Sequence, residues 1–334
     1  MNEIQKYLAE EHLADFRDGL ITRRELLRRV TLITGSAAAA TGFLVACGLG
    51  PQGSAITPAP PAPVTPPPTG GGTPSPVRPD IAYATPPAQA TTDGVTVRED
   101  DERIDAGPLT IKGPGGADLI AYQAAPKLRG VQLPGVLVIH ENRGLVPHIK
   151  DVTRRFATAG FFAAAIDLVS REGGADKLTD QGAYNAALGR RPVGEMVADL
   201  SAALDFLRGQ PLVNKARIGV TGYCFGGGMT WSVVNSGAAV QAAVPFYGPA
   251  PADVSGIGST RAAVLAVYAS DDARVTAGRD AIEPQLKKAG VPYRIEVYPG
   301  TGHGFHNDTG ARYNPEQARR AWVDTIDWFK RYIG

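Results

Sequence analysis

Cysteine is nearly absent from the 334-residue sequence, which contains only Cys47 and Cys224. Two thiols exclude a disulfide scaffold and any zinc or iron–sulfur site built from four cysteines. An excess of charge of one sign is also lacking, because 34 Lys and Arg stand against 33 Asp and Glu, for a formal net charge of +1. Such a balance argues against a protein that binds nucleic acid through a basic face. We therefore expect no nucleic-acid partner.

The uncharged run at residues 30–46 is too short for a typical membrane span. It holds 17 residues rich in Ala and Gly, whereas a spanning helix needs about 20 strongly apolar residues. Two arginine pairs precede the run, and the sequence TRRELLR at 22–28 resembles a twin-arginine export signal. We predict that residues 1–46 are an export signal. An amphipathic helix and an uncleaved anchor are the alternatives, and the partly acidic stretch before Arg23 departs from the usual short basic start.

The sequence LVAC at 44–47 resembles the lipobox of bacterial lipoproteins. It predicts a lipid on Cys47 and attachment to the outer face of the bacterial cytoplasmic membrane, or secretion if Cys47 is not lipidated. Residues 51–90 then carry 13 of the 27 prolines and only two charges. Such a segment buries too little apolar surface to fold and favours extended polyproline II conformations. We expect residues 47–90 to be a flexible linker.

Residues 91–334 have the pattern of one α/β domain. Short, continuous apolar runs bounded by turn residues are typical of buried parallel strands, and helical apolar spacing at 193–208 and 315–332 predicts helices that pack on a sheet. Together these patterns predict a three-layer α/β domain with a mostly parallel sheet. The predicted strands are 119–123, 135–140, 161–167, 217–222, 242–247, 263–269 and 293–298.

The run from Gly222 to Gly226 has the form Gly-x-nucleophile-x-Gly between a predicted strand and a predicted helix, with Cys224 at its centre. This is the pattern of a nucleophile elbow, whose sharp turn needs small residues on both sides of the nucleophile. The backbone N–H of Phe225 at the helix start then suits an oxyanion hole. The alternative is that Cys224 is a buried structural thiol, which is the usual state of a free cysteine.

A nucleophile elbow predicts an acid and then a histidine, each after a later strand. The two candidate loops hold Asp271 and Asp272, and His303 and His306. His303 lies between two glycines and is favoured, whereas one of the two aspartates is expected to serve the turn. No histidine pair has the spacing of helical metal ligands, and we expect neither a metal nor a cofactor.

The domain resembles the dienelactone hydrolase (carboxymethylenebutenolidase) family of α/β-hydrolases over essentially all of 91–334. The resemblance implies that Asp272 is the acid of the triad, that Glu141 lies beside the nucleophile, and that Asn142 supplies the second oxyanion N–H. The segments that carry it are 138–144 (VIHENRG), 167–172 (DLVSRE), 222–227 (GYCFGG), 272–275 (DARV) and 302–305 (GHGF).

By this resemblance Glu141 keeps the Cys224 thiol protonated at rest and accepts its proton once substrate is bound, because a second negative charge beside a carboxylate is unfavourable. His303 would protonate the leaving oxygen and assist hydrolysis of the thioester. The resemblance also implies that Arg171 binds a substrate carboxylate, and we place Tyr223 with it in the substrate site.

One position departs from the family pattern. The enzyme that opens dienelactone carries a second substrate-binding arginine shortly after its histidine, but this sequence continues Phe305-His306-Asn307-Asp308. One of the two arginines expected to bind the substrate carboxylate is therefore absent. This puts dienelactone itself in doubt as the substrate, but it leaves the prediction of ester or lactone hydrolysis unchanged. Arg143 and His306 are the candidates to compensate.

We predict a cysteine hydrolase of ester or lactone bonds that uses Cys224, His303 and Asp272 on a small-molecule substrate. Its expected place is outside the cell, on a lipid anchor, and its expected state is monomeric. The first alternative is a general carboxylesterase of neutral substrates. The second is a tethered binding lipoprotein that keeps the fold without the chemistry.

Overall fold

The structure, a computed structural model, describes residues 1–49, 84–128 and 130–334. Most of the expected 47–90 linker lies outside these residues. The described part of the chain contains an eight-stranded sheet with the order β1-β2-β4-β3-β5-β6-β7-β8. The strands are β1 (Ile104–Lys112), β2 (Asp118–Pro126), β3 (Leu133–Ile139), β4 (Phe162–Ile166), β5 (Val213–Tyr223), β6 (Ala242–Phe246), β7 (Ala263–Ala269) and β8 (Tyr293–Tyr298).

Helices precede the sheet and alternate with its strands. They are α1 (Glu3–Arg17), α2 (Arg23–Thr34), α3 (Ala37–Ala46), α4 (Pro147–Thr158), α5 (Gly174–Lys177), α6 (Gln181–Arg190), α7 (Val193–Gly209), α8 (Phe225–Asn235), α9 (Ala273–Thr276), α10 (Arg279–Ala289) and α11 (Pro315–Tyr332). Short 3-10 turns lie at Pro114–Gly116, Ser170–Glu172 and Ser255–Ser259.

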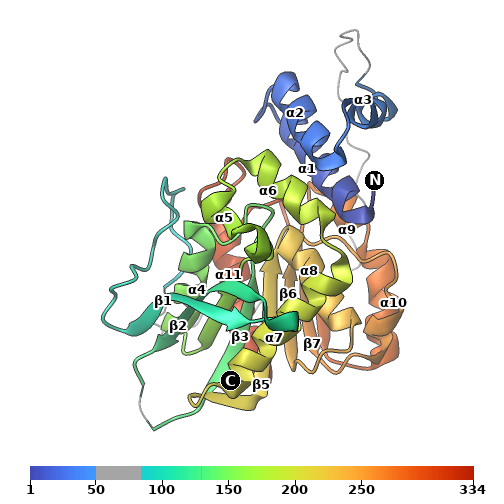
Figure 1. Cartoon of the computed structure of the whole chain (residues 1–334). Helices are drawn as coiled ribbons and strands as arrows, with labels where there is room; N and C mark the ends of the chain where they lie inside the picture. The colour runs from blue at the N-terminus through green and yellow to red at the C-terminus, as the bar shows by residue number, and fades with distance from the viewer. Residues whose placement is uncertain (50–83, 129) are drawn as a thin grey trace.

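The predicted three-layer α/β fold with a mostly parallel sheet is confirmed. The strands from β4 across β3 to β8 pair in parallel. α4 and α11 cover one face, where Phe156 stacks on Trp322 with ring centroids 4.7 Å apart. α7 and α8 lie on the opposite face (Figure 1). Every residue of β6 and β7 is buried, so the core follows the middle of the sheet.

Two details of the strand prediction are wrong. Residues 119–123 lie in a strand, but β2 pairs antiparallel with both β1 and β4 instead of in parallel. β1 was not predicted, because only Ile104 and Ile111 are buried in it and its other residues are exposed or half-buried. An antiparallel strand near a sheet edge faces water on one side, so it lacks the continuous apolar run that marks a buried parallel strand.

The N-terminal helices α1 and α2 lie over α6, and α3 packs against α2 (Figure 1). A small apolar cluster joins them, built from Ala9, Leu13, Leu26, Val30, Ala40 and Leu44. Each begins with a side-chain cap, at Asn2, Thr22 and Ser36 respectively. No single described helix is long and apolar enough to cross a membrane; α2 and α3 satisfy that test only as a pair, with a bend of 118° between them.

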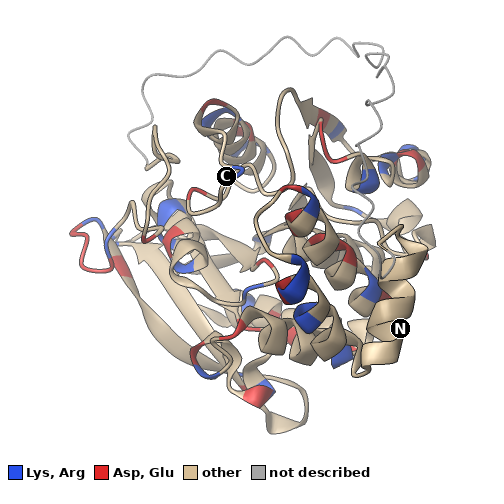
Figure 2. Ribbon diagram, turned by 90° about the horizontal axis from the view of Figure 1, so that it is seen from above, with Lys and Arg blue, Asp and Glu red and all other residues tan. Residues whose placement is uncertain are grey.

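Basic and acidic residues are interspersed over the helices and loops (Figure 2), as the balanced charge suggests. A network of charged side chains is deeply buried around Arg155. Arg155 of α4 is fully buried and pairs with Asp151 at 2.7 Å and with Asp308. Asp308 also accepts a hydrogen bond of 2.8 Å from His148. This network fixes the loop that follows His303 against α4.

Replacing Asp308 by Asn is expected to lower the free energy of unfolding by about 3 kcal/mol, because it leaves part of the buried Arg155 charge uncompensated. Burial alone raises the pKa of Asp308, but His148 and Arg155 hold it well below its usual range. The carboxylate therefore stabilises the fold above the unfolded-state pKa of about 4, and this stability is lost as pH falls below that value. Urea unfolding at neutral and acidic pH measures both effects. Asp280, an exposed carboxylate that pairs with Arg279, is the matched control. Asp280→Asn should change the free energy of unfolding by less than about 0.5 kcal/mol.

Candidate active site

The turn from β5 into α8 places Cys224 in a strained backbone conformation, with φ 58° and ψ −119°. Such a conformation is costly for a residue with a side chain and is typical of functional turns. A Cβ on Gly222 would lie 2.2 Å from the carbonyl oxygen of Gly226, and a Cβ on Gly226 would lie 2.4 Å from the oxygen of Ile139. Both glycines are therefore required by close backbone contacts, which is the physical reason for their spacing around the nucleophile.

His303 and Asp272 come together from the loops after β8 and β7. His303 Nδ1 lies 2.5 Å from Asp272 Oδ2, a distance at which the ring N–H donates to the carboxylate. Asp271 instead accepts a hydrogen bond from Ser270 at 2.8 Å. Burial raises the pKa of Asp272, but the contact with His303 outweighs it and the net pKa is lowered. Asp272 therefore stays ionised and orients the imidazole.

Glu141 and Asn142 follow β3 and line a small cavity that also contains Cys224 and His303. The side-chain amide of Asn307 donates a hydrogen bond of 2.5 Å to Glu141 Oε2. Asn307 occupies the position at which the family resemblance implies an arginine. In this chain that position fixes the buried carboxylate of Glu141, a role that the sequence did not suggest.

Arg171 and Tyr223, the two predicted substrate-binding residues, are not among the residues that line this cavity. Arg171 forms a two-point ion pair with Asp199, with an Nη2 to Oδ1 distance of 2.9 Å. Tyr223 is fully buried and stacks on His306, with ring centroids 4.9 Å apart. Their roles in binding stay predictions.

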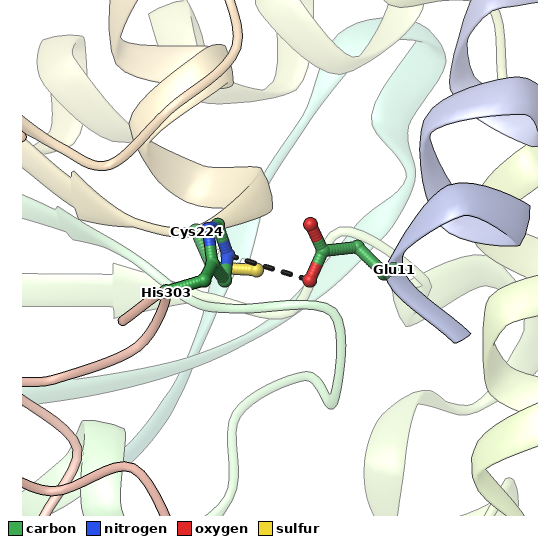
Figure 3. A group of neighbouring side chains, drawn as sticks. All are labelled: Glu11, Cys224 and His303. Atoms are coloured by element: carbon green, nitrogen blue, oxygen red, sulfur yellow. Dashed lines mark ion pairs between the residues drawn. The ribbon is translucent and has the colours of Figure 1, made fainter. Parts of the chain in front are cut away.

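Two side chains of α1 reach the nucleophile. The hydroxyl of Tyr7 lies 3.3 Å from Cys224 Sγ, and Glu11 Oε2 lies 3.4 Å from His303 Nε2. Figure 3 shows the Glu11 carboxylate pointing at His303, with the sulfur of Cys224 beside their contact. Glu11 also pairs with Arg274 of α9. Residues 1–46 were expected to lie outside the catalytic domain, and neither contact is predicted by the sequence.

The sequence contains a weak pattern that is consistent with the contact between α1 and the active site. Tyr7, Glu11 and Asp15 are spaced at four-residue intervals, and Asp18 follows three residues later, so they share one face of a helix. Asp15 and Asp18 both pair with Arg312, at 3.1 Å and 2.6 Å. The face is recognisable only when its basic partner residues, almost 300 positions away, are known.

These contacts set the protonation of the site. Burial, the Glu11 carboxylate and Glu141 raise the pKa of the Cys224 thiol, although His303 opposes them. Burial lowers the pKa of His303, but Glu11, Cys224 and Asp272 raise it well above its ordinary value. Burial and the two carboxylates therefore favour the protonated form of the Cys224 thiol, which is a poor nucleophile.

Glu11, Cys224 and His303 together are the residues of the described chain that offer a possible metal-binding set. Their ligand atoms lie within 4.8 Å of one another. A carboxylate, a thiolate and an imidazole are ligands that zinc accepts. Any metal there would bind the thiol and the imidazole that are predicted to act as nucleophile and base.

A sheet with helices on both faces, an elbow cysteine and a histidine–aspartate pair define a hydrolase of the α/β-hydrolase class. The model of the dienelactone hydrolase family matches residues 119–333, and the chain belongs to that family. A Methylorubrum extorquens protein provisionally named a carboxymethylenebutenolidase is 34% identical over 263 residues, 75% of this chain and 89% of its own length. A protein of the same provisional name from Escherichia coli strain K12 is 30% identical over 263 residues, 74% of this chain and 95% of its own length.

Solved structures agree. The crystal structure of a Klebsiella pneumoniae protein, provisionally named a dienelactone hydrolase, matches with a TM-score of 0.63 and 30% identity, over 69% of this chain and 99% of that chain. The Pyrococcus horikoshii acylaminoacyl peptidase, at 18% identity and a TM-score of 0.57, covers 70% of this chain and 42% of its own and shows the same fold. The predicted family and the assignment as a hydrolase are thus confirmed.

Glu141→Gln is expected to lower the pKa of the Cys224 thiol, because it removes one of the negative charges that disfavour the thiolate. Ultraviolet absorbance of the thiolate, followed against pH in a Cys47→Ser background, measures this change directly. Glu172 is an exposed carboxylate, and Glu172→Gln should leave the thiol pKa unchanged. An unchanged thiol pKa in Glu141→Gln would contradict the assigned influence of Glu141.

Proposed function

We propose that this protein hydrolyses carboxylic ester or lactone bonds by nucleophilic catalysis, with a triad of Cys224, His303 and Asp272. The hydrogen bond of 2.5 Å between His303 and Asp272 carries the proposal, because it orients an imidazole that has a ring nitrogen within 4.8 Å of Cys224 Sγ. The names of the relatives support lactone and ester bonds as the substrate class.

In the proposed reaction, Cys224 loses its proton to Glu141 and attacks the carbonyl carbon of the substrate. The backbone N–H groups of Phe225 and Asn142 stabilise the oxyanion. His303 protonates the leaving oxygen, which gives a thioester on Cys224 and a free alcohol. Water, deprotonated by His303, then attacks the thioester and releases the carboxylic acid and the Cys224 thiolate, which takes its proton back from Glu141. Neither step uses a metal or cofactor.

The test follows the thioester intermediate. The full chain is mixed with para-nitrophenyl acetate or dienelactone, quenched with acid, and examined by mass spectrometry. An acyl group on the peptide that contains Cys224, together with steady-state turnover, is the expected result. Because α1 covers the thiol, the same measurement is made with Glu11→Arg, which sets like charges at positions 11 and 274. Turnover without an adduct, unchanged in Cys224→Ala, would reject the cysteine mechanism.

We further propose that residues 1–46 direct export and that Cys47 then carries a lipid, so that the contacts of α1 with the active site belong to the chain before the signal is removed. Arg23 and Arg24 are exposed at the start of α2, which suits recognition by an export apparatus, and Cys47 follows directly after α3. Cell fractionation of the host compares the parent with Arg23→Lys/Arg24→Lys, and intact-mass measurement detects the lipid. Retention of the double variant inside the cell is expected. Equal export of both forms would overturn the twin-arginine assignment.

A further inference from the structure

The nucleophile is sealed in the described state. The residue Cys224 is 4% exposed and Glu11 is 5% exposed, and the adjoining cavity holds about 90 Å³. Pockets that bind small molecules usually measure about 300–1,000 Å³. A substrate therefore reaches Cys224 only after α1 has moved. The side chains that α1 places beside the sulfur occupy space that the substrate later fills.

The side chain that fills this space is the carboxylate of Glu11, which pairs with Arg274. Glu11 accepts a hydrogen bond from the guanidinium of Arg274 and contacts His303. Arg274 stands two residues after Asp272, on the short helix α9, and its guanidinium lies 5.0 Å from the centre of the Tyr7 ring. Although burial lowers its pKa, Glu11 raises it above the ordinary value, so Arg274 remains charged. A planar guanidinium is the side chain best suited to bind a carboxylate with directed hydrogen bonds.

We propose that Arg274 is the carboxylate-binding residue of the active site and that Glu11 holds the place of a substrate carboxylate. This inference rests on the proposed function and defines its substrate class. The substrates are esters or lactones that carry a carboxylate near the bond to be cleaved. Arg171, for which the family resemblance implies this role, is committed to Asp199 in the described state.

A second set of ion pairs between carboxylates and an arginine holds the N-terminal segment in place. Asp15 and Asp18, at the end of α1, pair with Arg312, which lines the cavity, whereas Arg274 reaches the cavity through its partner Glu11. Glu11 is the carboxylate that contacts His303. Because Arg312 itself lines the cavity, the matched control for Arg274 is Arg279, which pairs with Asp280 and is not a lining residue.

The first part of the experiment tests whether Glu11 occupies the substrate site. Glu11→Arg in the full chain places two like charges together and is expected to raise kcat/KM for para-nitrophenyl acetate by about tenfold or more, since a buried charge pair is replaced by repulsion. Glu3→Arg, at an exposed position of the same helix, should leave the rate unchanged. Equal, Cys224-dependent rates in the parent and Glu11→Arg would overturn the occupancy of the substrate site by Glu11.

The second arm tests the subsite, in the Glu11→Arg background. Turnover of mono-para-nitrophenyl succinate is compared with that of the neutral acetate ester. Arg274→Gln is expected to lower the ratio of acidic to neutral kcat/KM by about tenfold, mainly through KM, because a charge-assisted hydrogen bond is lost. Arg279→Gln should leave the ratio unchanged. The ratio cancels any difference in folding or in opening of α1. An unchanged ratio in Arg274→Gln would overturn the proposal.

A binding measurement separates this inference from the proposed function. Succinate should protect Cys224 of the Glu11→Arg variant from alkylation by iodoacetamide, and Arg274→Gln should abolish the protection. This readout needs no turnover. Protection that depends on Arg274 supports the subsite even if no ester is hydrolysed, whereas Cys224-dependent hydrolysis without Arg274-dependent protection rejects the subsite and leaves the hydrolase proposal intact.

Discussion

Cys224→Ala abolishes hydrolysis of para-nitrophenyl acetate, with an expected fall in kcat/KM of about a thousandfold or more in the Glu11→Arg chain. Alanine cannot form the thioester, so only binding and the oxyanion donors remain to promote direct attack by water. The substitution removes one sulfur from the elbow without adding bulk, and the turn glycines Gly222 and Gly226 keep their contacts. Initial rates followed by release of para-nitrophenolate, corrected for the uncatalysed reaction, measure the loss.

The second cysteine of the chain provides the control. Cys47 lies at the end of α3 and is partly exposed, so Cys47→Ala should retain the full rate. A Cys224→Ala enzyme that keeps more than about a tenth of the parent rate would require a different nucleophile. Thermal unfolding of both variants confirms that the comparison is made between folded proteins.

The central strands and the elbow were accessible from sequence because local signals define them. The bounds of β7 and β8 agree with the predicted 263–269 and 293–298. β7 is buried at every residue, and a short strand of this kind appears in the sequence as an uninterrupted apolar run. The order of cysteine, aspartate and histidine along the chain also depends only on which strand each residue follows.

The missed features depend on contacts between distant parts of the chain. Glu11 meets Arg274 across 263 positions, and no local pattern at either residue indicates the other. The apolar and arginine-rich character of residues 23–46 directed the interpretation toward export and left the acidic face of α1 without a role. Asn307 is similar: as a substitution for arginine it suggested a loss, and only the fold shows its amide on Glu141.

Asp272→Asn is expected to lower kcat by about 10²- to 10⁴-fold in the Glu11→Arg chain. An amide at this position can present its NH₂ group to His303 Nδ1, which favours the tautomer with the proton on Nε2 and removes the base that faces the substrate. The effect should fall mainly on kcat, because Asp272 contacts His303 and not the substrate. Asp271 provides the matched control: it bonds Ser270, and Asp271→Asn should preserve the rate.

The pH dependence adds a readout that a general loss of structure would not produce. The pKa of His303 is raised, with Asp272 among the causes, so the imidazole becomes an effective base for thioester hydrolysis only as pH rises toward that pKa. Removing the carboxylate charge lowers the pKa of His303, and the rising limb of kcat against pH should move to lower pH in Asp272→Asn. The limb of Asp271→Asn should coincide with that of the parent. A fall in kcat with an unmoved limb would mean that Asp272 supports the loop without tuning the base, and the triad would then reduce to Cys224 and His303.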